Sequence, residues 1–210
     1  MRRRAGAKED LLRMAGLLPH DPALCIAPAA MDDALPLPDR CIVLVGLMGA
    51  GKSTVGRRLA KRLGRPFIDS DDEIEKAADR SISEIFNAFG EASFRDGERR
   101  VIARLIGGPP KVIATGGGAF MDEQTRALIL ERCVAVWLDA DIPTLAERVK
   151  RRDHRPLLQG KDPAEVLERL AELRRPFYAQ AHIHIRSEAV PHERAVDMVL
   201  AALAERETRI

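Results

Sequence analysis

One stretch, Cys41 to Thr54, constrains the fold more than any other part of the chain. It reads CIVLVGLMGAGKST: a short apolar run, a turn with three glycines, and then a lysine followed by two hydroxyl residues. A basic, helix-favouring run from Val55 to Leu63 comes next. This order predicts a buried strand, a tight loop and the start of a helix, and the spacing of the glycines, lysine and serine fits the phosphate-binding P-loop pattern in full.

The predicted loop has the chemistry of a polyphosphate site. Glycines let the backbone turn with positive φ and bring N–H groups close to an anion, and the following helix directs the positive end of its dipole to the same place. Lys52 would reach the β- and γ-phosphates, and the Ser53 hydroxyl would hold Mg²⁺. The alternative, a glycine-rich turn that carries lysine and serine by chance, leaves the strand before it and the helix after it unexplained.

Composition is typical of a globular protein with one domain. Hydrophobic residues make up 46% and charged residues 31% of the 210 residues, and a chain of this length buries a full core. The net charge is +2 and aromatic residues are only 4%, so nothing indicates a nucleic-acid partner. No apolar run approaches the ~20 residues of a membrane span. The three cysteines have no CxxC spacing, so we expect buried thiols in a reducing compartment and a cytoplasmic protein.

The order of the expected elements predicts the fold class. Residues 1–40 have balanced charges and five prolines, so we expect a disordered N-terminal extension before a domain of residues 41–207. In that domain strand-like and helix-like runs alternate, which predicts an α/β fold with a doubly wound, parallel, five-stranded sheet. The apolar run Cys133–Leu138 is expected to be central in the sheet. Helices are expected to break at Gly90 and to end before Pro176.

Two segments place polar side chains or bare backbone at the ends of predicted strands. Asp69 and Asp71 alternate at the end of one strand, where open α/β sheets bind ligands. One could order the water shell of Mg²⁺ and the other could accept a proton from an acceptor hydroxyl, while both could also cap a helix. Gly116, Gly117 and Gly118 end another strand, which suits either the close approach of a ligand or a simple sharp turn.

Two groups of charged residues are further candidates for a site. Arg95 and Glu98 are three apart on one predicted helix and can form an ion pair, either as a clamp for an acidic substrate or as a solvated pair. The run from Arg148 to Leu158 concentrates positive charge at the end of a predicted helix, residues 139–151, and on the predicted loop that follows, residues 152–162. Over a P-loop such a loop is a natural lid with phosphate-seeking arginines, although many charged runs are only solvated.

Together these features resemble the shikimate kinase family, small P-loop kinases related to the nucleoside-monophosphate kinases. The resemblance covers Cys41 to about Leu203, and its specific pieces stand in the family's order and at similar spacing. They are Phe67-Ile68-Asp69-Ser70-Asp71, Phe94-Arg95-x-x-Glu98, Gly116-Gly117-Gly118, Arg155-Pro156-Leu157-Leu158 and Arg174-x-Pro176-x-Tyr178. The resemblance implies a substrate-binding helical segment at about 70–105 and a lid at about 152–162.

The resemblance also implies roles for individual residues. The residues implied to bind ATP are Gly49, Ala50, Gly51, Lys52, Ser53, Thr54, Arg152 and Arg155, with Arg152 stacking on adenine and Arg155 reaching the phosphates. Those implied to bind shikimate are Asp71, Arg95, Gly117 and Arg174. Those implied to hold Mg²⁺ are Ser53 and, through water, Asp69. The implied catalytic residues are Lys52, Asp71 as the candidate base, and Arg155.

The implied reaction transfers a phosphoryl group from ATP to the 3-hydroxyl of shikimate, in the synthesis of chorismate and aromatic amino acids. The implied enzyme is a monomer that uses Mg²⁺ and binds neither nucleic acid nor membranes. Two alternatives stay open at this point. Another small-molecule kinase of the same group, such as a gluconate kinase, would also use arginines for a carboxylate. A catalytically inactive nucleotide-binding module would account for the P-loop but not for the joint presence of Lys52, Ser53, Asp69 and Asp71.

Overall fold

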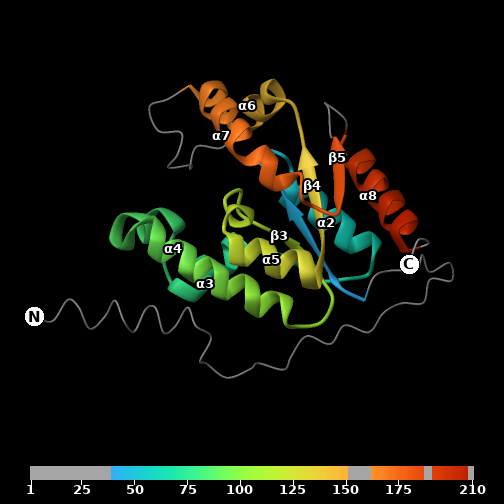
Figure 1. The fold of residues 1–210 in the computed structure, drawn as a ribbon, viewed down its shortest axis with the longest axis horizontal. Helices are drawn as coiled ribbons and strands as arrows, with labels where there is room; N and C mark the ends of the chain where they lie inside the picture. The colour runs from blue at the N-terminus through green and yellow to red at the C-terminus, as the bar shows by residue number, and fades with distance from the viewer. Residues whose placement is uncertain (1–38, 151–161, 187–190, 208–210) are drawn as a thin grey trace, which may run out of the picture.

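A parallel sheet forms the centre of the part of the chain that the computed structural model describes, residues 39–150, 162–186 and 191–207 (Figure 1). Its strands are β1 (Cys41–Val45), β2 (Phe67–Asp69), β3 (Val112–Ala114), β4 (Cys133–Asp139) and β5 (Ile183–Arg186). Their order in the sheet is β2-β3-β1-β4-β5, and every neighbouring pair is parallel. The predicted five-stranded parallel sheet is therefore confirmed.

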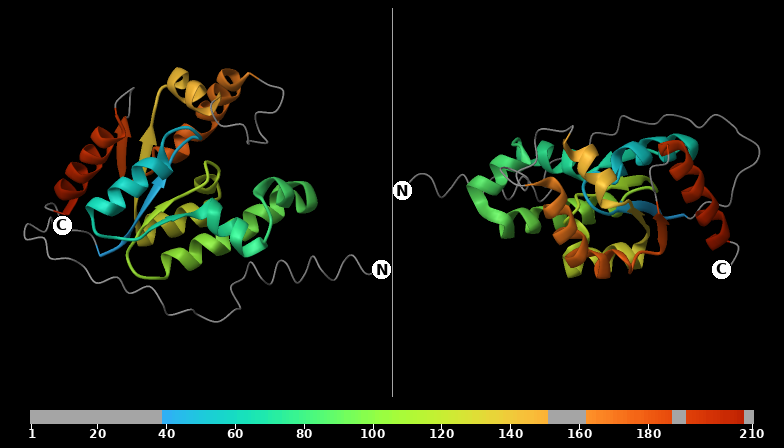
Figure 2. Two further views of the ribbon diagram at one scale, coloured as in Figure 1. Left: turned by 180° about the vertical axis from the view of Figure 1, so that it is seen from behind. Right: turned by 90° about the horizontal axis from the view of Figure 1, so that it is seen from above.

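Helices cover both faces of this sheet (Figure 2). They are α2 (Lys52–Arg62), α3 (Ser70–Ala78), α4 (Ile82–Ile106), α5 (Glu123–Arg132), α6 (Ile142–Lys150), α7 (Pro163–Tyr178) and α8 (His192–Glu207), with a 3₁₀ turn, η1, at Ala119–Met121. Helices α2 and α8 lie on one face and α5 lies on the other, while α6 and α7 lie beyond the carboxyl ends of the strands (Figures 1 and 2). The arrangement confirms the doubly wound α/β class.

Burial explains why the two strands richest in apolar residues lie inside the sheet. All residues of β1 and β4 are buried. Strand β1 is the middle strand, and β4 lies beside it with β5 on its other side. Cys41 and Cys133, which are paired in register on these strands, are buried free thiols, as predicted. None of the helices in the described ranges is long and apolar enough to cross a membrane.

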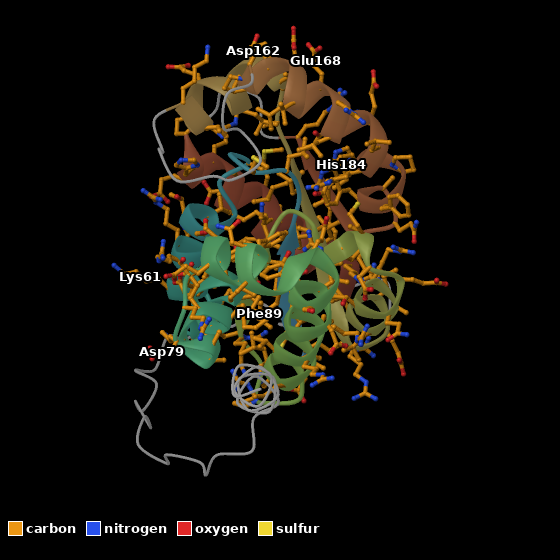
Figure 3. All side chains as sticks on the ribbon, turned by 90° about the vertical axis from the view of Figure 1, so that its left-hand side faces the viewer. Lys61, Asp79, Phe89, Asp162, Glu168 and His184 are labelled. Atoms are coloured by element: carbon orange, nitrogen blue, oxygen red, sulfur yellow. The ribbon has the colours of Figure 1, made fainter. Side chains whose placement is uncertain are left out.

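Two helices test the predicted helix ends. At Gly90 the backbone of α4 has φ 77° and ψ 172°, so the predicted break is present as a bend between two helical halves (Figure 3, in which Phe89 marks the bend). The end predicted before Pro176 is wrong, because α7 continues through this proline to Tyr178. In this last turn Pro176 has no N–H to donate to the carbonyl oxygen of Glu172, so packing must offset this lost helical hydrogen bond. Tyr178 is 1% exposed and packs on the ring of Trp137, at a centroid distance of 5.9 Å, which holds that turn in place.

Several predicted segments lie outside the described residues. Of the predicted extension, residues 1–40, only 39 and 40 are described, and both are exposed. The predicted lid, 152–162, lies outside the described ranges except for Asp162. Arg152 and Arg155 therefore stay predictions.

Candidate active site

The loop between β1 and α2 has the backbone geometry of a phosphate cradle. Gly49 and Gly51 have φ values of 83° and 88°, in the left-handed region that glycine adopts at little cost. Gly51 directly precedes α2 and brings no side chain to its first N–H groups. These donors and the positive end of the helix dipole are therefore directed at the loop, where an anion is stabilised.

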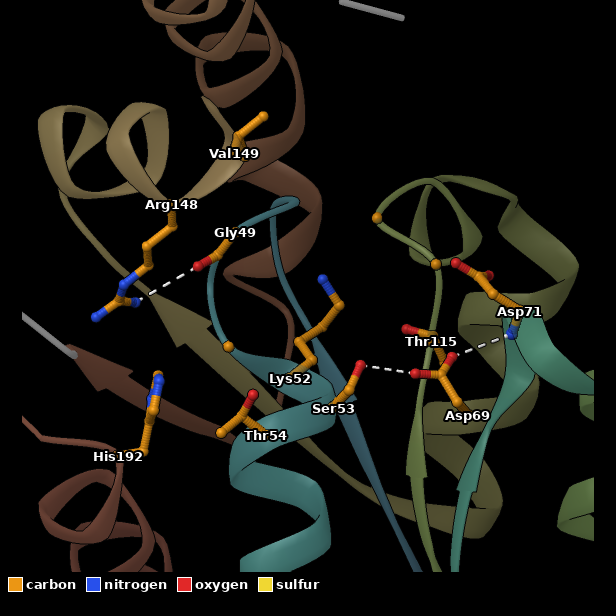
Figure 4. Close-up of a pocket in the computed structure, with 13 residues that line it drawn as sticks. Gly49, Lys52, Ser53, Thr54, Asp69, Asp71, Thr115, Arg148, Val149 and His192 are labelled. Carbon is orange, nitrogen blue, oxygen red and sulfur yellow. Dashed lines mark hydrogen bonds between the residues drawn. The ribbon is translucent and has the colours of Figure 1, made fainter. Parts of the chain in front are cut away.

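Lys52 and Ser53 begin α2 and line a cavity of about 370 Å³ beside this loop (Figure 4). The Lys52 ammonium donates to the carbonyl oxygens of Gly46, at 2.8 Å, and Leu47, at 2.9 Å. The Ser53 hydroxyl donates to a carboxylate oxygen of Asp69 at 2.6 Å. The two residues predicted to hold Mg²⁺ thus lie within hydrogen-bond distance of each other.

Asp69 and Asp71 reach the cavity from different elements. Asp69 ends β2 and caps α3, since its second carboxylate oxygen accepts from the N–H of Asp71 at 3.2 Å. Helix α3 begins at Ser70, so Asp71 lies in its first turn and not on the strand that was predicted to carry both aspartates. Asp69 therefore both caps α3 and lines the cavity. Asp71 reaches the site because the chain turns into a helix at this point.

A second cavity of about 400 Å³ adjoins the first. Its lining includes the four residues predicted to bind the acceptor, Asp71, Arg95, Gly117 and Arg174. Asp71, Gly116 and Gly117 line both cavities. A ligand in the second cavity would therefore meet a ligand of the P-loop cavity at Asp71.

The pair Arg95–Glu98 is mostly buried in the second cavity, not solvated. The Arg95 guanidinium donates to Glu98 at 2.6 Å and to Glu91 at 3.2 Å, and the Glu98 side chain is only 2% exposed. Burial raises the pKa of Glu98 to about 7, against the opposing pull of Arg95. The pair holds the guanidinium at the wall of the cavity, where its remaining N–H groups suit a carboxylate.

Close approach by two side chains accounts for the glycines after β3. A Cβ added to Gly116 would lie 2.7 Å from a carboxylate oxygen of Asp71, and one added to Gly118 would overlap the Arg95 guanidinium. A larger residue at either position would displace a side chain that lines the acceptor cavity. The simple-turn alternative is therefore insufficient for these two glycines.

Gly117 is fixed by the end of α7. Its carbonyl oxygen accepts from the Arg174 guanidinium at 3.0 Å and from the Tyr178 hydroxyl at 2.5 Å. Burial raises the pKa of Tyr178 to about 12, so the hydroxyl stays a donor. From the sequence, Tyr178 was predictable only as part of a motif, because a link to Gly117 requires knowing where α7 ends.

Arg148 and His192 also line the P-loop cavity (Figure 4), and neither was predicted from the sequence to be a site residue. Arg148 lies in the last turn of α6, and its guanidinium donates to the carbonyl oxygen of Gly49 at 3.4 Å. His192 begins α8. The basic run of the sequence pointed toward Arg148, whereas no motif pointed to His192.

The buried carboxyl of Glu98 gives stability a specific pH dependence. Because its folded pKa, about 7, lies above the ordinary 4.5, the folded protein keeps a proton that the unfolded chain has lost. The free energy of unfolding should therefore fall as pH rises from about 4.5 to about 7, by up to about 3 kcal/mol relative to Glu98→Gln. Urea unfolding at four pH values would measure this difference. For Glu91→Gln, at the exposed partner of Arg95, the free energy of unfolding should change with pH as it does in the wild type. If Glu98→Gln also shows the same change with pH as the wild type, the prediction is wrong.

The fold and the site define a class of protein. A P-loop between the first strand and its helix, a serine bonded to an aspartate, and an adjoining cavity with two arginines are the parts of a P-loop small-molecule kinase. The family model for shikimate kinase matches residues 48–204. The chain belongs to the shikimate kinase family.

Comparison with individual proteins gives the same family. The chain is 60% identical to the shikimate kinase of Caulobacter vibrioides (strain NA1000 / CB15N) over 174 residues, 83% of this chain and 87% of that protein. It is 58% identical to that of Zymomonas mobilis over 164 residues, 78% of this chain and 93% of the relative. A solved structure of shikimate kinase from Acinetobacter baumannii in complex with shikimate has a TM-score of 0.77 at 37% identity, and covers 80% of this chain and 95% of that one.

Proposed function

We propose that the chain transfers the γ-phosphoryl group of ATP to the 3-hydroxyl of shikimate, with Mg²⁺. One observation carries the proposal: a P-loop cavity and an acceptor cavity adjoin, and Asp71 lines both. The first cavity offers Lys52 and the start of α2 to a polyphosphate, and the second offers Arg95 and Arg174 to a carboxylate. The solved relative in complex with shikimate supports the same acceptor.

The residues beside the P-loop fit a magnesium ion. Ser53 and Asp69 provide a hydroxyl and a carboxylate oxygen, the hard donors that Mg²⁺ prefers. Mg²⁺ commonly binds through one or two carboxylates, with phosphate oxygens and water completing its shell, and no cluster of three or more metal-ligating side chains is found among the described residues. When bound, the ion neutralises charge on the phosphates.

The remaining residues have separate roles in the proposed transfer. Arg95 and Arg174 would grip the carboxylate of shikimate, which orients its hydroxyl toward Asp71. Asp71 would accept the hydroxyl proton as the oxygen attacks the γ-phosphorus and ADP leaves. Lys52 would stabilise the charge on the transferred group, and Arg148 would contact the nucleoside side of ATP. Gly117 would donate from its backbone to shikimate.

The proposal also covers the oligomeric state, the location, the partners and the lid of the protein. We propose a monomer that acts in the cytoplasm without a nucleic-acid or membrane partner, and a lid in which Arg152 and Arg155 bind ATP. Size-exclusion chromatography with light scattering would check the monomer. Substitution of each lid arginine, with the Michaelis constant for ATP as the readout, would check the lid.

An acceptor panel tests the proposed function. ADP release would be coupled to a spectrophotometric readout with shikimate, gluconate or no acceptor, with and without Mg²⁺, and ³¹P NMR would locate the phosphate on the product. We expect ADP only with shikimate and Mg²⁺, and phosphate on the 3-hydroxyl. A preference for gluconate would favour the other small-molecule kinase. Nucleotide binding without turnover of any acceptor would favour the inactive module.

Arg95→Lys should weaken use of shikimate much more than use of ATP. Lysine keeps the charge but lacks the planar fork that matches a carboxylate, so we expect the Michaelis constant for shikimate to rise about tenfold to a hundredfold. Steady-state kinetics with each substrate varied would measure the effect. Arg100→Lys, on the same helix and paired with Asp96 at 2.7 Å, should leave both constants unchanged. A change confined to the ATP constant would mean that the cavity has been assigned to the wrong ligand.

A further inference from the structure

The imidazole of His192 is placed directly against the P-loop. A Cβ added to Gly51 would lie 3.1 Å from its Cε1 and 3.3 Å from its Nδ1. The ring lines the same cavity as Lys52 and Thr54. In Figure 4 the His192 ring and the Arg148 guanidinium lie on the same side of the loop, away from Asp69 and Asp71. A polyphosphate seated on the first turn of α2 therefore comes within reach of the imidazole.

The side chain of His192 has no evident structural task. Among the described residues it forms no hydrogen bond or ion pair. The start of α8 is held by backbone: the Pro191 carbonyl accepts from the N–H groups of Arg194, at 3.0 Å, and Ala195, at 3.4 Å. A half-buried imidazole that faces a polar cavity and leaves helix capping to the backbone is available to a ligand.

The charges around His192 disfavour its protonated imidazole when no anion is bound. Burial, followed by Arg148 from α6 and Arg58 from α2, lowers its pKa below the ordinary value. Glu193 acts in the opposite direction, but its carboxylate is paired with Arg58 at 2.8 Å. A nucleotide polyphosphate brings several negative charges to this place, and such charges favour the protonated imidazole.

We propose that His192 is a nucleotide-binding residue of this chain and that it takes up a proton as the polyphosphate binds. The inference rests on the nucleotide half of the proposed function and is independent of the acceptor. Because the complex holds a proton that the free protein lacks, the contribution of His192 to affinity should grow as pH falls from 8 to 6. Nucleotide binding by this chain is then linked to pH through a residue outside the P-loop motif.

Calorimetric titration of the full chain with Mg²⁺ and the ATP analogue AMP-PNP tests the proposal. Titrations at pH 7 in two buffers of different ionisation enthalpy report the protons taken up, and titrations at pH 6, 7 and 8 report the affinity. His192→Asn keeps a polar side chain but cannot titrate. We expect it to lose the proton uptake, and its dissociation constant relative to wild type to rise from about twofold at pH 8 to about tenfold at pH 6.

Matched variants identify the group that titrates. Arg194→Gln, an exposed change in the same turn of α8, should bind as wild type at each pH. His20→Asn, at a histidine outside the described residues and outside the proposed lid, should still take up the proton. Proton uptake that persists in His192→Asn, or a ratio of dissociation constants near one at every pH, would overturn the proposal.

Two further readouts separate this proposal from folding defects and from the proposed function. In the wild type, the NMR titration of the His192 Cε1 proton should move to higher pH on addition of AMP-PNP; an unmoved titration would also overturn the proposal. If wild type binds AMP-PNP with proton uptake but does not phosphorylate shikimate, the proposed acceptor fails alone. If shikimate is phosphorylated and His192→Asn binds AMP-PNP as wild type does, only the role of His192 fails.

Discussion

Lys52→Met is expected to lower turnover with ATP and shikimate about a hundredfold to a thousandfold. The ammonium is held over the loop by two carbonyl oxygens, at 2.8 Å and 2.9 Å, and Lys52 lines the same cavity as Ser53. Its attraction to the transferred group strengthens as negative charge develops on the phosphoryl oxygens, so its loss acts mainly on the chemical step. The turnover number at saturating substrates measures the effect.

The matched control for this variant lies on the same helix. Lys61 is exposed (Figure 3) in the last turn of α2, at the other end of the helix from the P-loop, so Lys61→Met should retain turnover and melting temperature. Thermal unfolding of Lys52→Met with and without AMP-PNP shows whether the loop still forms. Turnover close to wild type in a folded Lys52→Met protein would refute the P-loop assignment.

Asp71→Asn is expected to lower turnover about a hundredfold to ten-thousandfold, the range for losing a general base. Asparagine keeps the size of the side chain and can accept a hydrogen bond, but it cannot take the proton of the acceptor hydroxyl. Because Asp71 lines both cavities, its carboxylate stands where the two substrates would meet. The Michaelis constant for ATP should change little, while the turnover number falls.

Asp72→Asn is the neighbouring control. Asp72 is the next residue of α3 and is exposed, so removing its charge tests the general electrostatics of the helix start without touching the cavities. Turnover of Asp72→Asn should stay near wild type. If both variants lose turnover equally, the effect belongs to the charge of α3 and not to proton transfer by Asp71.

The parts of the site that the sequence predicts are those built by local chemistry. The P-loop is contiguous, so its strand, its glycines and Lys52 specify one another within a few residues. The strand ends that carry Asp69 and Gly116 were also predictable, because the carboxyl ends of parallel strands meet at one edge. Helical propensity and spacing were enough to put Arg95 and Glu98 side by side, although not to predict that Glu98 is buried.

The features that sequence reasoning missed depend on packing between distant segments. The end of α7 passes Pro176 because Tyr178 packs on Trp137, and local rules on proline contain no such contact. In the sequence, His192 comes after the P-loop by more than half the length of the chain, and only the position of α8 beside α2 brings its ring to Gly51. A strand through Asp71 was the natural prediction from alternation, but the cap at Asp69 turns the chain into α3 instead.

The two hydrogen bonds on the Gly117 carbonyl have a consequence for how the acceptor cavity could change. A loop of successive glycines has little stiffness of its own, and here the stiffness is supplied by the C-terminal end of α7, through Arg174 and Tyr178. Tyr178 is not part of the cavity lining. The shape of the acceptor cavity can thus be retuned from a distance, by changes in the packing of Tyr178, while every residue that would touch the acceptor keeps its identity.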